Sequence, residues 1–456
     1  MLTATNPATG EHLHDYPALT MEQMATRIDQ AHSAFNFWRQ QGFAERARVL
    51  RAVADYMRDH ADELGRPMTL EMGKPAHEAR GEVLKAAWCA EHYADHAEAY
   101  LAPQHLGSDA TRSYVQHPPL GPVLGILPWN APFWLAFRFC APALMAGNTC
   151  LMKHDPHVPA CAEAISRCFE AVNAPSGIFQ NLPLHNQHIA TAIIHPQVRA
   201  VSFTGSSAAG AQVAATATGA LKPVVLELGG SDPAIVLADA DLDAAVEAIA
   251  LSRIINAGQS CIAAKRIIVE DAVHDTFVER LHAALAALRL GDPDDPNTQV
   301  GPLARADLRD NLARQVEESI AAGARCLLGG QMPVGPGFFY PVTLLTEAHN
   351  QMPACREETF GPVAVVLRAR DADHALALAN DTDYGLAASI WTTSERGEAL
   401  AQDLEAGQVV VNGLVKTDPR LPSGGIKRSG LGRELGPHGI LAFVNVQQVW
   451  IGPKTE

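Results

Sequence analysis

The chain has 456 residues, which is more than one hydrophobic core usually holds, so two or three domains are expected. Hydrophobic residues make up 47% and charged residues 19%, a balance typical of a globular protein and not of a disordered one. The formal net charge of -15 at pH 7 argues against nucleic acid or an anionic membrane as the main partner. It does not exclude a small anionic substrate, because one local arginine can outweigh a distant net charge.

Several features indicate a cytoplasmic protein without a membrane span. Residues 1–13 lack the basic segment and apolar core of a secretory signal. The most apolar region, 121–152, is interrupted by prolines and by Arg138, which a bilayer would leave unsatisfied. The eight cysteines form no CxxC pair, which favours reduced thiols. No metal site is predicted, because a solvated helix face explains the spacing of His92 and His96.

The chain begins with helices and continues with alternating strands and helices. Apolar residues recur at three- and four-residue spacing over 21–41, 43–64 and 78–101, which predicts three helices. Short apolar runs then predict strands at 122–127, 148–152, 200–203 and 223–228, separated by helices at 133–146, 158–172 and 206–218. Such alternation implies crossover connections and an α/β fold with a doubly wound, mostly parallel sheet.

A second alternating region follows Gly229 and Gly230. Its patterns predict helices at 238–256 and 275–290, and strands at 266–269, 363–367 and 408–411. A second α/β unit is therefore expected after the first.

One cysteine stands at a junction between a helical pattern and a strand pattern. The run is Gly258-Gln259-Ser260-Cys261-Ile262. Backbone N–H groups at such a junction can stabilise a thiolate and make Cys261 a nucleophile. Taken alone, Cys261 is better explained as a small buried hydrophobic residue, the usual place of a lone cysteine among isoleucine and alanine.

Two further polar residues interrupt apolar runs. Glu227 ends an apolar strand pattern beside two glycines, where burial would raise its pKa and suit a general base. A helix cap or a buried ion pair would also explain it. Asn130 is held between Pro128 and Pro132, so its amide could serve as an oxyanion donor or simply form a turn.

A possible phosphate site follows the strand that ends at Phe203. Gly205 and Ser206 begin the next helical pattern, and free N–H groups at a helix start can bind phosphate. The run is not GxGxxG, and Gly-Ser turns are common, so this signal is weak by itself.

Together these motifs make the chain resemble the aldehyde dehydrogenase superfamily across almost its whole length. The matching runs are Pro128-Trp129-Asn130, Met152-Lys153, Phe203-Thr204-Gly205-Ser206, Glu227-Leu228-Gly229-Gly230, Gly258-Gln259-Ser260-Cys261, Glu357-Glu358-Thr359-Phe360-Gly361-Pro362 and Ser429-Gly430-Leu431-Gly432-Arg433-Glu434. Within the superfamily the chain is most similar to bacterial succinate-semialdehyde dehydrogenases, an interpretation supported by Ser231-Asp232-Pro233 and Ala263-Ala264-Lys265-Arg266.

The resemblance implies a catalytic role for three residues. Cys261 would attack the aldehyde carbon to form a thiohemiacetal, with Asn130 and the Cys261 N–H group binding the oxyanion. After hydride transfer to NAD or NADP, Glu227 would activate the water that hydrolyses the thioester.

The resemblance also implies the cofactor contacts. Lys153 would contact the adenosine ribose, Gly205 and Ser206 would lie under the pyrophosphate, and Glu358 would bind the nicotinamide ribose. Phe360 and Trp129 would line the nicotinamide site.

One departure bears on the choice of cofactor. Members that prefer NAD usually have a glutamate three residues after the lysine, and here that residue is Pro156. Without this carboxylate a 2′-phosphate is not repelled, so NADP use is expected. His154 either approaches that phosphate or is a solvated loop residue.

The substrate prediction rests mainly on Arg138. It lies eight positions after Asn130 in an otherwise apolar helix, where the resemblance implies a carboxylate-binding arginine. A buried ion pair is the alternative. The second arginine of some relatives is replaced by Ile255, so Arg420 would take its role. Ser423 stands where a phenylalanine is common, which would widen the substrate mouth.

The resemblance implies a domain organisation and an oligomer. Residues 1–100 and 123–228 would form the dinucleotide-binding domain, 229–426 the catalytic domain, and 101–122 with 440–456 the bridging segments. The alternating residues 443–450 predict a strand with an exposed edge, so a homodimer or a dimer of dimers is expected.

Three other functions stay open at this stage. The substrate could be glutarate semialdehyde or an aliphatic or aromatic aldehyde. The protein could be a silent NAD-binding structural protein, which the presence of Cys261, Glu227 and Asn130 disfavours. It could also be a thiol hydrolase without a cofactor, which Lys153 and Glu358 disfavour.

Overall fold

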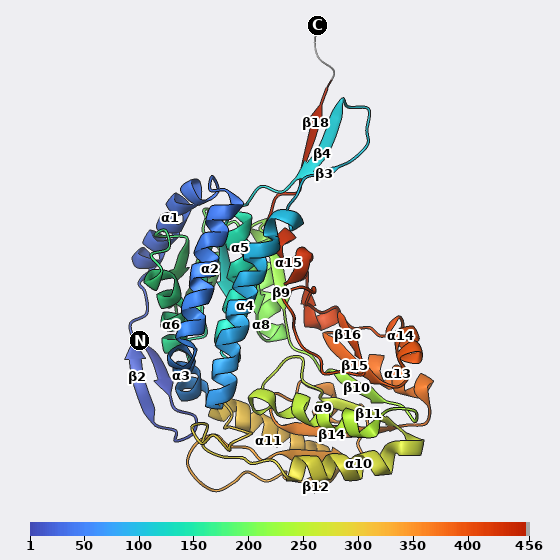
Figure 1. Ribbon diagram of the computed structural model, residues 1–456. Helices are drawn as coiled ribbons and strands as arrows, with labels where there is room; N and C mark the ends of the chain where they lie inside the picture. The colour runs from blue at the N-terminus through green and yellow to red at the C-terminus, as the bar shows by residue number, and fades with distance from the viewer. Residues whose placement is uncertain (453–456) are drawn as a thin grey trace.

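The computed structural model describes residues 1–452, and its first sheet is built from the strands predicted in the N-terminal half (Figure 1). The order in this six-stranded sheet is β17-β9-β8-β5-β6-β7. The strands are β5 (Pro122–Ile126), β6 (Thr149–Lys153), β7 (Phe179–Asn181), β8 (Ala200–Thr204), β9 (Val224–Glu227) and β17 (Gly430–Leu431). The strands β5 to β9 are parallel, and only β17 is antiparallel.

Helices cover both faces of this sheet, which explains why its strands are continuous apolar runs. Val123 and Met152 face the core shared with α2 to α6, whereas Leu124 and Leu151 face the core shared with α1, α7 and α8. The helices are α1 (Met21–Trp38), α2 (Phe43–Asp59), α3 (Ala61–Met72), α4 (Ala76–Tyr100), α5 (Pro132–Ala146), α6 (Pro159–Ala171), α7 (Ile189–Ile194), after the 3-10 turn η1 (Asn186–His188), and α8 (Ser207–Gly219).

The second sheet has seven strands in the order β12-β13-β14-β11-β10-β15-β16, and only β12 is antiparallel to its neighbour. The strands are β10 (Pro233–Val236), β11 (Arg266–Glu270), β12 (Arg325–Leu328), β13 (Thr343–Thr346), β14 (Val363–Ala369), β15 (Ala387–Trp391) and β16 (Gln408–Val411). The surrounding helices are α9 (Leu242–Ile254), α10 (Asp271–Ala286), α11 (Ala306–Ala321), α12 (Pro353–Arg356), α13 (Ala372–Asn380) and α14 (Ser394–Ala401).

Three predicted helices have clearly different bounds in the structure, and one of them, predicted over 275–290, begins and ends four residues earlier as α10. The helix predicted over 43–64 is divided at His60, whose φ of -118° and ψ of 24° are not helical. The helix predicted from residue 238 begins at Leu242, because Asp241 caps it by accepting a hydrogen bond from the Ala244 N–H at 3.1 Å. It ends at Ile254, four residues before the end of the 3-10 turn η2 (Ile255–Gly258).

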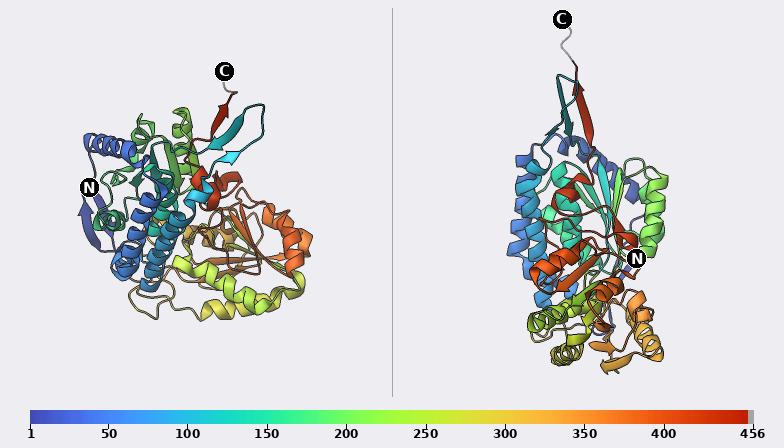
Figure 2. Two further views of the ribbon diagram at one scale, coloured as in Figure 1. Left: turned by 45° about the horizontal axis from the view of Figure 1, so that its top comes forward. Right: turned by 90° about the vertical axis from the view of Figure 1, so that its right-hand side faces the viewer.

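A narrow three-stranded sheet projects from the body as an arm, as both side views show (Figures 1 and 2). Its order is β18-β4-β3, formed by β3 (Gln104–His105), β4 (Arg112–Gln116) and β18 (Gln447–Ile451). The remaining elements are β1 (Leu2–Thr5), β2 (His12–Tyr16), η3 (Lys427–Ser429) and α15 (Gly436–Leu441). No helix within residues 1–452 is long and apolar enough to cross a membrane.

Candidate active site

A cavity of about 1140 Å³ gathers most of the predicted site residues from both large sheets. Its wall includes the loops after β5, β8 and β9 of the first sheet and the segment between α9 and β11 of the second. The predicted residues that line it are Trp129, Asn130, Arg138, Lys153, Gly205, Ser206, Glu227, Cys261, Glu358 and Phe360.

The segment before Cys261 has an unusual backbone. Asn256, Ala257 and Gly258 have φ angles of 56°, 52° and 74°, so three consecutive residues adopt the left-handed conformation. This conformation is unfavourable for alanine, and such backbone strain is typical of functional sites. At position 258 a Cβ atom would lie 2.4 Å from the Gly361 carbonyl oxygen, so glycine is required. The tight turn places Cys261 at the wall of the cavity.

Lys265, which sequence reasoning did not assign to the site, binds the backbone of the Cys261 loop. Its buried ammonium donates to the carbonyl oxygens of Ser260 and Cys261 at 3.1 and 2.5 Å. The signal that could have identified it is a lysine inside the apolar run that leads into β11. Burial raises the pKa of the Cys261 thiol to about 11, while Lys265 and Arg138 oppose this shift. The thiol is therefore protonated at neutral pH in this form.

Asn130 lies next to the same loop. Its Nδ2 atom donates to the Gln259 carbonyl oxygen at 3.1 Å. The backbone carbonyl oxygen of Asn130 accepts from Asn256 Nδ2 at 2.8 Å and from Lys74 Nζ at 3.1 Å. Because a carboxamide has two N–H donors, the second remains available for a substrate oxygen.

Glu227 is the last residue of β9 and is buried. Its Oε2 atom accepts from Arg138 Nη2 at 3.0 Å, whereas Oε1 has no hydrogen-bond partner among the described residues. Burial raises the pKa of Glu227 to about 7, with Arg138 opposing and Glu434 reinforcing the shift. The group can therefore exchange protons near neutral pH.

Arg138 is paired with a second buried carboxylate as well. Glu434 Oε2 lies 2.8 Å from Arg138 Nη2, and Glu434 Oε1 accepts from Ser202 Oγ at 2.9 Å. Burial alone would lower the pKa of Arg138, but the two carboxylates raise it. The pairing of β17 with β9 brings Glu434 from the far end of the chain, so sequence reasoning missed it.

The other two predicted substrate residues do not line the cavity. Arg420 is an exposed residue whose guanidinium is bound to the Asp418 carboxylate at 2.9 and 2.6 Å. Ser423 is buried, and its backbone exchanges hydrogen bonds of 2.7 and 2.8 Å with Glu434. Neither side chain forms part of the cavity wall.

The predicted cofactor residues lie along the same cavity. Lys153 Nζ donates to Asn186 Oδ1 at 2.6 Å, and burial lowers the pKa of Lys153 to about 8. Ser206 caps α8 by accepting from the Ala209 N–H at 3.3 Å. Glu358 Oε1 accepts from the Gly230 N–H at 3.1 Å.

Two close contacts shape this wall of the cavity. Trp129 and Phe360 pack edge to face with their ring centroids 5.7 Å apart. A Cβ atom at Gly229 would lie 2.2 Å from Glu358 Oε2, so the glycine lets the Glu358 carboxylate approach the strand end.

His154 is neither a solvated loop residue nor part of the cavity wall. It is buried, and its Nε2–H donates to the Pro132 carbonyl oxygen at 3.3 Å while Nδ1 accepts from the Asp155 N–H at 3.0 Å. Burial lowers its pKa to about 4, so it is neutral. Both sequence interpretations of His154 were wrong, because the two backbone groups hold the ring inside the protein.

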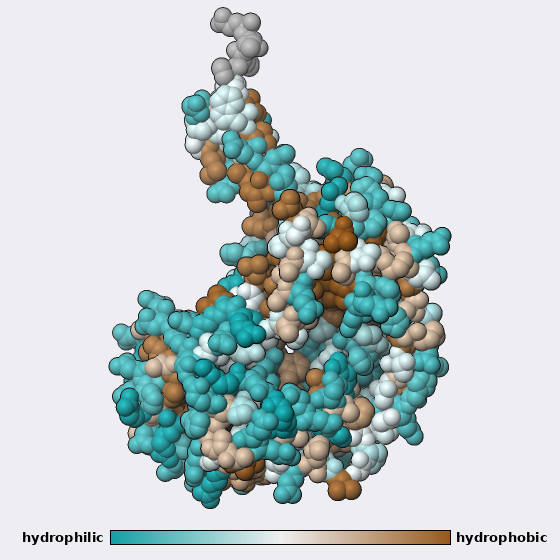
Figure 3. Space-filling view, turned by 180° about the vertical axis from the view of Figure 1, so that it is seen from behind, coloured by the Kyte–Doolittle hydropathy of each residue, from teal (hydrophilic) through white to brown (hydrophobic). Residues whose placement is uncertain are grey.

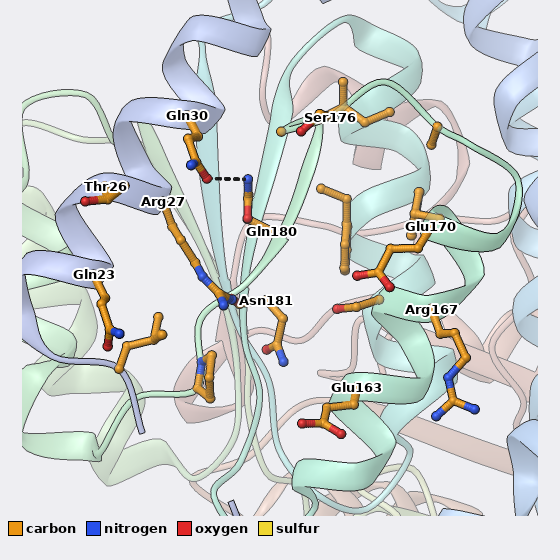
Figure 4. A pocket seen from close by; sticks show the side chains of 18 of the residues that line it. Gln23, Thr26, Arg27, Gln30, Glu163, Arg167, Glu170, Ser176, Gln180 and Asn181 are labelled. Atoms are coloured by element: carbon orange, nitrogen blue, oxygen red, sulfur yellow. Dashed lines mark hydrogen bonds between the residues drawn. The ribbon is translucent and has the colours of Figure 1, made fainter. Parts of the chain in front are cut away.

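A second cavity, of about 930 Å³, lies between α1 and α6 beside the edge strand β7 (Figure 4). Arg27 reaches across it from α1, and Glu163, Arg167 and Glu170 line it from α6. Gln180 Nε2 donates to Gln30 Oε1 at 3.3 Å across the same space. It shares no lining residue with the first cavity.

Comparison with known proteins identifies the class to which this arrangement belongs. The model of the aldehyde dehydrogenase family matches residues 1–449. The chain is 46% identical over 454 residues, 99% of each chain, to succinate-semialdehyde dehydrogenase [NADP(+)] 1 of Mycobacterium tuberculosis. It is 44% identical over 446 residues to the succinate semialdehyde dehydrogenase [NAD(P)+] of Escherichia coli, covering 98% of this chain and 96% of that one.

A solved structure supports the same conclusion. The structure of the succinic semialdehyde dehydrogenase of Streptococcus pyogenes in complex with NADP+ superposes on this chain with a TM-score of 0.97 and 34% sequence identity. The match covers 99% of this chain and 100% of that one. The chain therefore belongs to the aldehyde dehydrogenase family. The predictions of an aldehyde dehydrogenase-like α/β fold and of an NAD(P)-dependent aldehyde dehydrogenase are confirmed.

The buried ion pairs of Arg138 generate a first prediction. Replacing it (Arg138→Met) leaves Glu227 and Glu434 buried without a cation, which should destabilise the fold by about 3–5 kcal/mol. The loss should be larger at pH 8 than at pH 6, because burial raises the pKa of Glu227 to about 7 and this carboxylate is mostly neutral at the lower pH. The difference in thermal unfolding midpoint between the wild type and Arg138→Met, determined at both pH values, measures this destabilisation.

Arg51→Met is the matched control, since both side chains of its ion pair with Asp95 are exposed and the pair should contribute little. Equal midpoints for the wild type and Arg138→Met would contradict the role assigned to this pair.

Proposed function

We propose that the chain oxidises succinate semialdehyde to succinate with NADP+ or NAD+ through a covalent bond to Cys261. The observation that carries the proposal is the meeting of Cys261, Asn130 and Glu227 in one cavity with the cofactor residues. The substrate is inferred from the names of the relatives, which cover nearly the whole chain. We infer a cytoplasmic setting because all eight cysteines, Cys261 included, are free.

The same cavity suits a dinucleotide. Lys153 would contact the adenosine ribose, and Ser206 with the first N–H groups of α8 would bind the pyrophosphate. Glu358 would bind the nicotinamide ribose, with Phe360 and Trp129 beside the ring. When bound, the nicotinamide accepts the hydride that leaves the aldehyde carbon. Pro156 supplies no carboxylate that would repel a 2′-phosphate, which supports the use of NADP+.

The first covalent step joins Cys261 to the substrate. The thiol releases its proton to solvent as Sγ bonds to the aldehyde carbon, and the electron pair of the carbonyl π bond moves to the aldehyde oxygen, which becomes negatively charged. The free N–H of the Asn130 amide and the backbone N–H of Cys261 would stabilise this oxyanion. Loss of a hydride from the same carbon then leaves a thioester on Cys261.

Glu227 completes the reaction. Its Oε1 atom, which Arg138 does not bind, would take a proton from water while the water oxygen bonds to the thioester carbon. The carbon–sulfur bond breaks, and the products are a carboxylate and the free thiol. A pKa of about 7 allows Glu227 to accept this proton and return it to solvent.

The choice of substrate gives a second prediction. NADPH or NADH absorbance should report a much higher kcat/KM for succinate semialdehyde than for butanal, with NADP+ accepted at least as well as NAD+. Cys261→Ala should abolish turnover and retain nucleotide binding. Equal kcat/KM values for the two aldehydes would discard the semialdehyde assignment, and the absence of turnover with every pair would support a silent NAD-binding protein.

The role of Glu227 gives a third prediction. Glu227→Gln should release about one reduced cofactor per active site in a rapid burst and then turn over about 100- to 10,000-fold more slowly, because thioester hydrolysis lacks its base. In the wild type, hydrolysis should slow as the pH falls below about 7, since Glu227 becomes protonated. Stopped-flow absorbance measures both. An unchanged steady-state rate in Glu227→Gln would remove the carboxylate from the mechanism.

We also infer a division of the chain into three parts. Residues 1–100 and 123–228 would bind the dinucleotide, 229–426 would carry the nucleophile, and 101–122 with 440–456 would bridge subunits. The two large sheets support the first two parts. Residues 453–456 of the bridging part lie outside the described residues.

The arm supports a homodimer or a dimer of dimers. A sheet of three short strands is only marginally stable alone, and β18 presents an open edge. Apolar side chains are exposed along it, and brown residues gather on the arm in Figure 3. The exposed large apolar residues of the arm and its base are Leu106, Val446, Trp450 and Ile451. A second copy of the chain would bury this surface.

A fourth prediction tests the arm. The double variant Val446→Glu, Trp450→Glu should sediment as a monomer and keep the circular dichroism of the wild type. Leu221→Glu is the control, because Leu221 is even more exposed than Val446 and Trp450 but lies away from the arm. A monomeric wild type would contradict the proposed assembly.

A further inference from the structure

Lys85 is a cationic residue of the cavity that neither the sequence motifs nor the proposed mechanism uses. It lies on α4, partly buried, and lines the cavity together with Trp134 and Arg138. Its ammonium donates to Thr417 Oγ1 at 3.0 Å and lies 4.2 Å from the centroid of the Trp134 ring. These two contacts fix its position without neutralising its charge.

The other buried cations of the cavity wall already have partners. Lys74 is paired with Glu82, and Lys153 donates to Asn186 at the end assigned to the cofactor. Arg138 holds two carboxylates. By contrast, no carboxylate oxygen within residues 1–452 lies within 4 Å of the Lys85 ammonium. Lys85 is thus a partly desolvated cation that faces the cavity without a counter-ion.

Arg138 is poorly suited to bind a substrate carboxylate in addition to Glu227 and Glu434. A substrate carboxylate would have to displace Glu227 or Glu434 from the guanidinium, and the displaced carboxylate would remain buried without a cation. Lys85 requires no such exchange. Lys85, Arg138 and Cys261 line the same cavity. Lys85 is close enough to Arg138 for the two positive charges to repel each other, and Arg138 is close enough to Cys261 to favour its thiolate.

We propose that the Lys85 ammonium binds the distal carboxylate of the substrate while Cys261 attacks its aldehyde group. This inference rests on the proposed semialdehyde function. The Thr417 hydroxyl, which accepts from Lys85, is free to donate its own hydrogen to the same carboxylate. The Trp134 ring provides an apolar wall for the methylene groups between the two ends of the substrate.

The protonation of Lys85 is consistent with this role. Burial and Arg138 lower the pKa of Lys85 to about 8, while Glu82, Cys89 and Asp418 oppose the shift. The ammonium is therefore still mostly charged at pH 7, and a bound carboxylate would raise its pKa again. The KM for a carboxylated aldehyde should consequently rise above pH 8, whereas the KM for butanal should change less.

The experiment compares Lys85→Met and Lys85→Arg with the wild type. Lys85→Met should raise the KM for succinate semialdehyde about 10- to 100-fold, the usual effect of losing a hydrogen bond to a charged group. The KM for butanal should change less than about threefold, and Lys85→Arg should restore most of the loss. Inhibition by succinate, measured with butanal as the substrate, should weaken in the same proportion as the KM rises. Arg80→Met, an exposed cation on the same helix, should leave both KM values unchanged.

Each contrary outcome has a distinct meaning. An equal rise in the KM for both aldehydes would show that Lys85 only maintains the shape of the wall and would overturn the inference. A selective loss in Lys416→Met and not in Lys85→Met would move the carboxylate to the exposed lysine at the rim. A wild type without preference for succinate semialdehyde would refute the proposed substrate itself, whatever the Lys85 variants do.

Discussion

The chemistry of this protein depends on one buried guanidinium held between two carboxylates. Arg138 comes from α5, Glu227 from the end of β9, and Glu434 from the segment after β17. An isolated carboxylate at the position of Glu227 would be protonated well above neutral pH, because burial strongly disfavours its charge. Arg138 offsets that penalty and keeps the pKa near 7. The same contact joins helix α5 to the end of β9 and to the segment after β17, so the geometry of this edge of the sheet and its acid–base property have one cause.

A second constraint acts on the nucleophile. The left-handed backbone over residues 256–258 is unfavourable in isolation, and it persists because surrounding groups hold it on several sides. Arg253 Nη2 donates to the Gly258 carbonyl oxygen at 2.6 Å, and Lys265 holds the carbonyl oxygens of Ser260 and Cys261. Lys265 also opposes the rise in the Cys261 pKa, as Arg138 does. Lys265 therefore both positions the loop and tunes the thiol.

Sequence reasoning anticipated the features that arise from local pattern and missed those that arise from long-range contact. The buried parallel strands could be predicted because each is an apolar run of the right length, and ten of the motif residues do line one cavity. The capped start of α9 and the break at His60 depend on single residues within longer helical patterns. Glu434 could not be paired with Arg138 in advance, because nothing in a linear sequence reveals that β17 joins β9.

The case of Arg138 shows why a charged residue in an apolar helix is ambiguous. Burial requires an anion, but the sequence does not reveal whether a side chain or a substrate provides it. In the structure, Glu227 and Glu434 occupy the guanidinium, whereas Lys85, one helix away, faces the same cavity with no carboxylate of residues 1–452 within 4 Å. A lysine in an amphipathic helix gives no signal, because most such lysines face solvent. If Lys85 binds the substrate, the protein separates two tasks that one arginine would otherwise share. Arg138 then controls the base, while Lys85 selects the substrate.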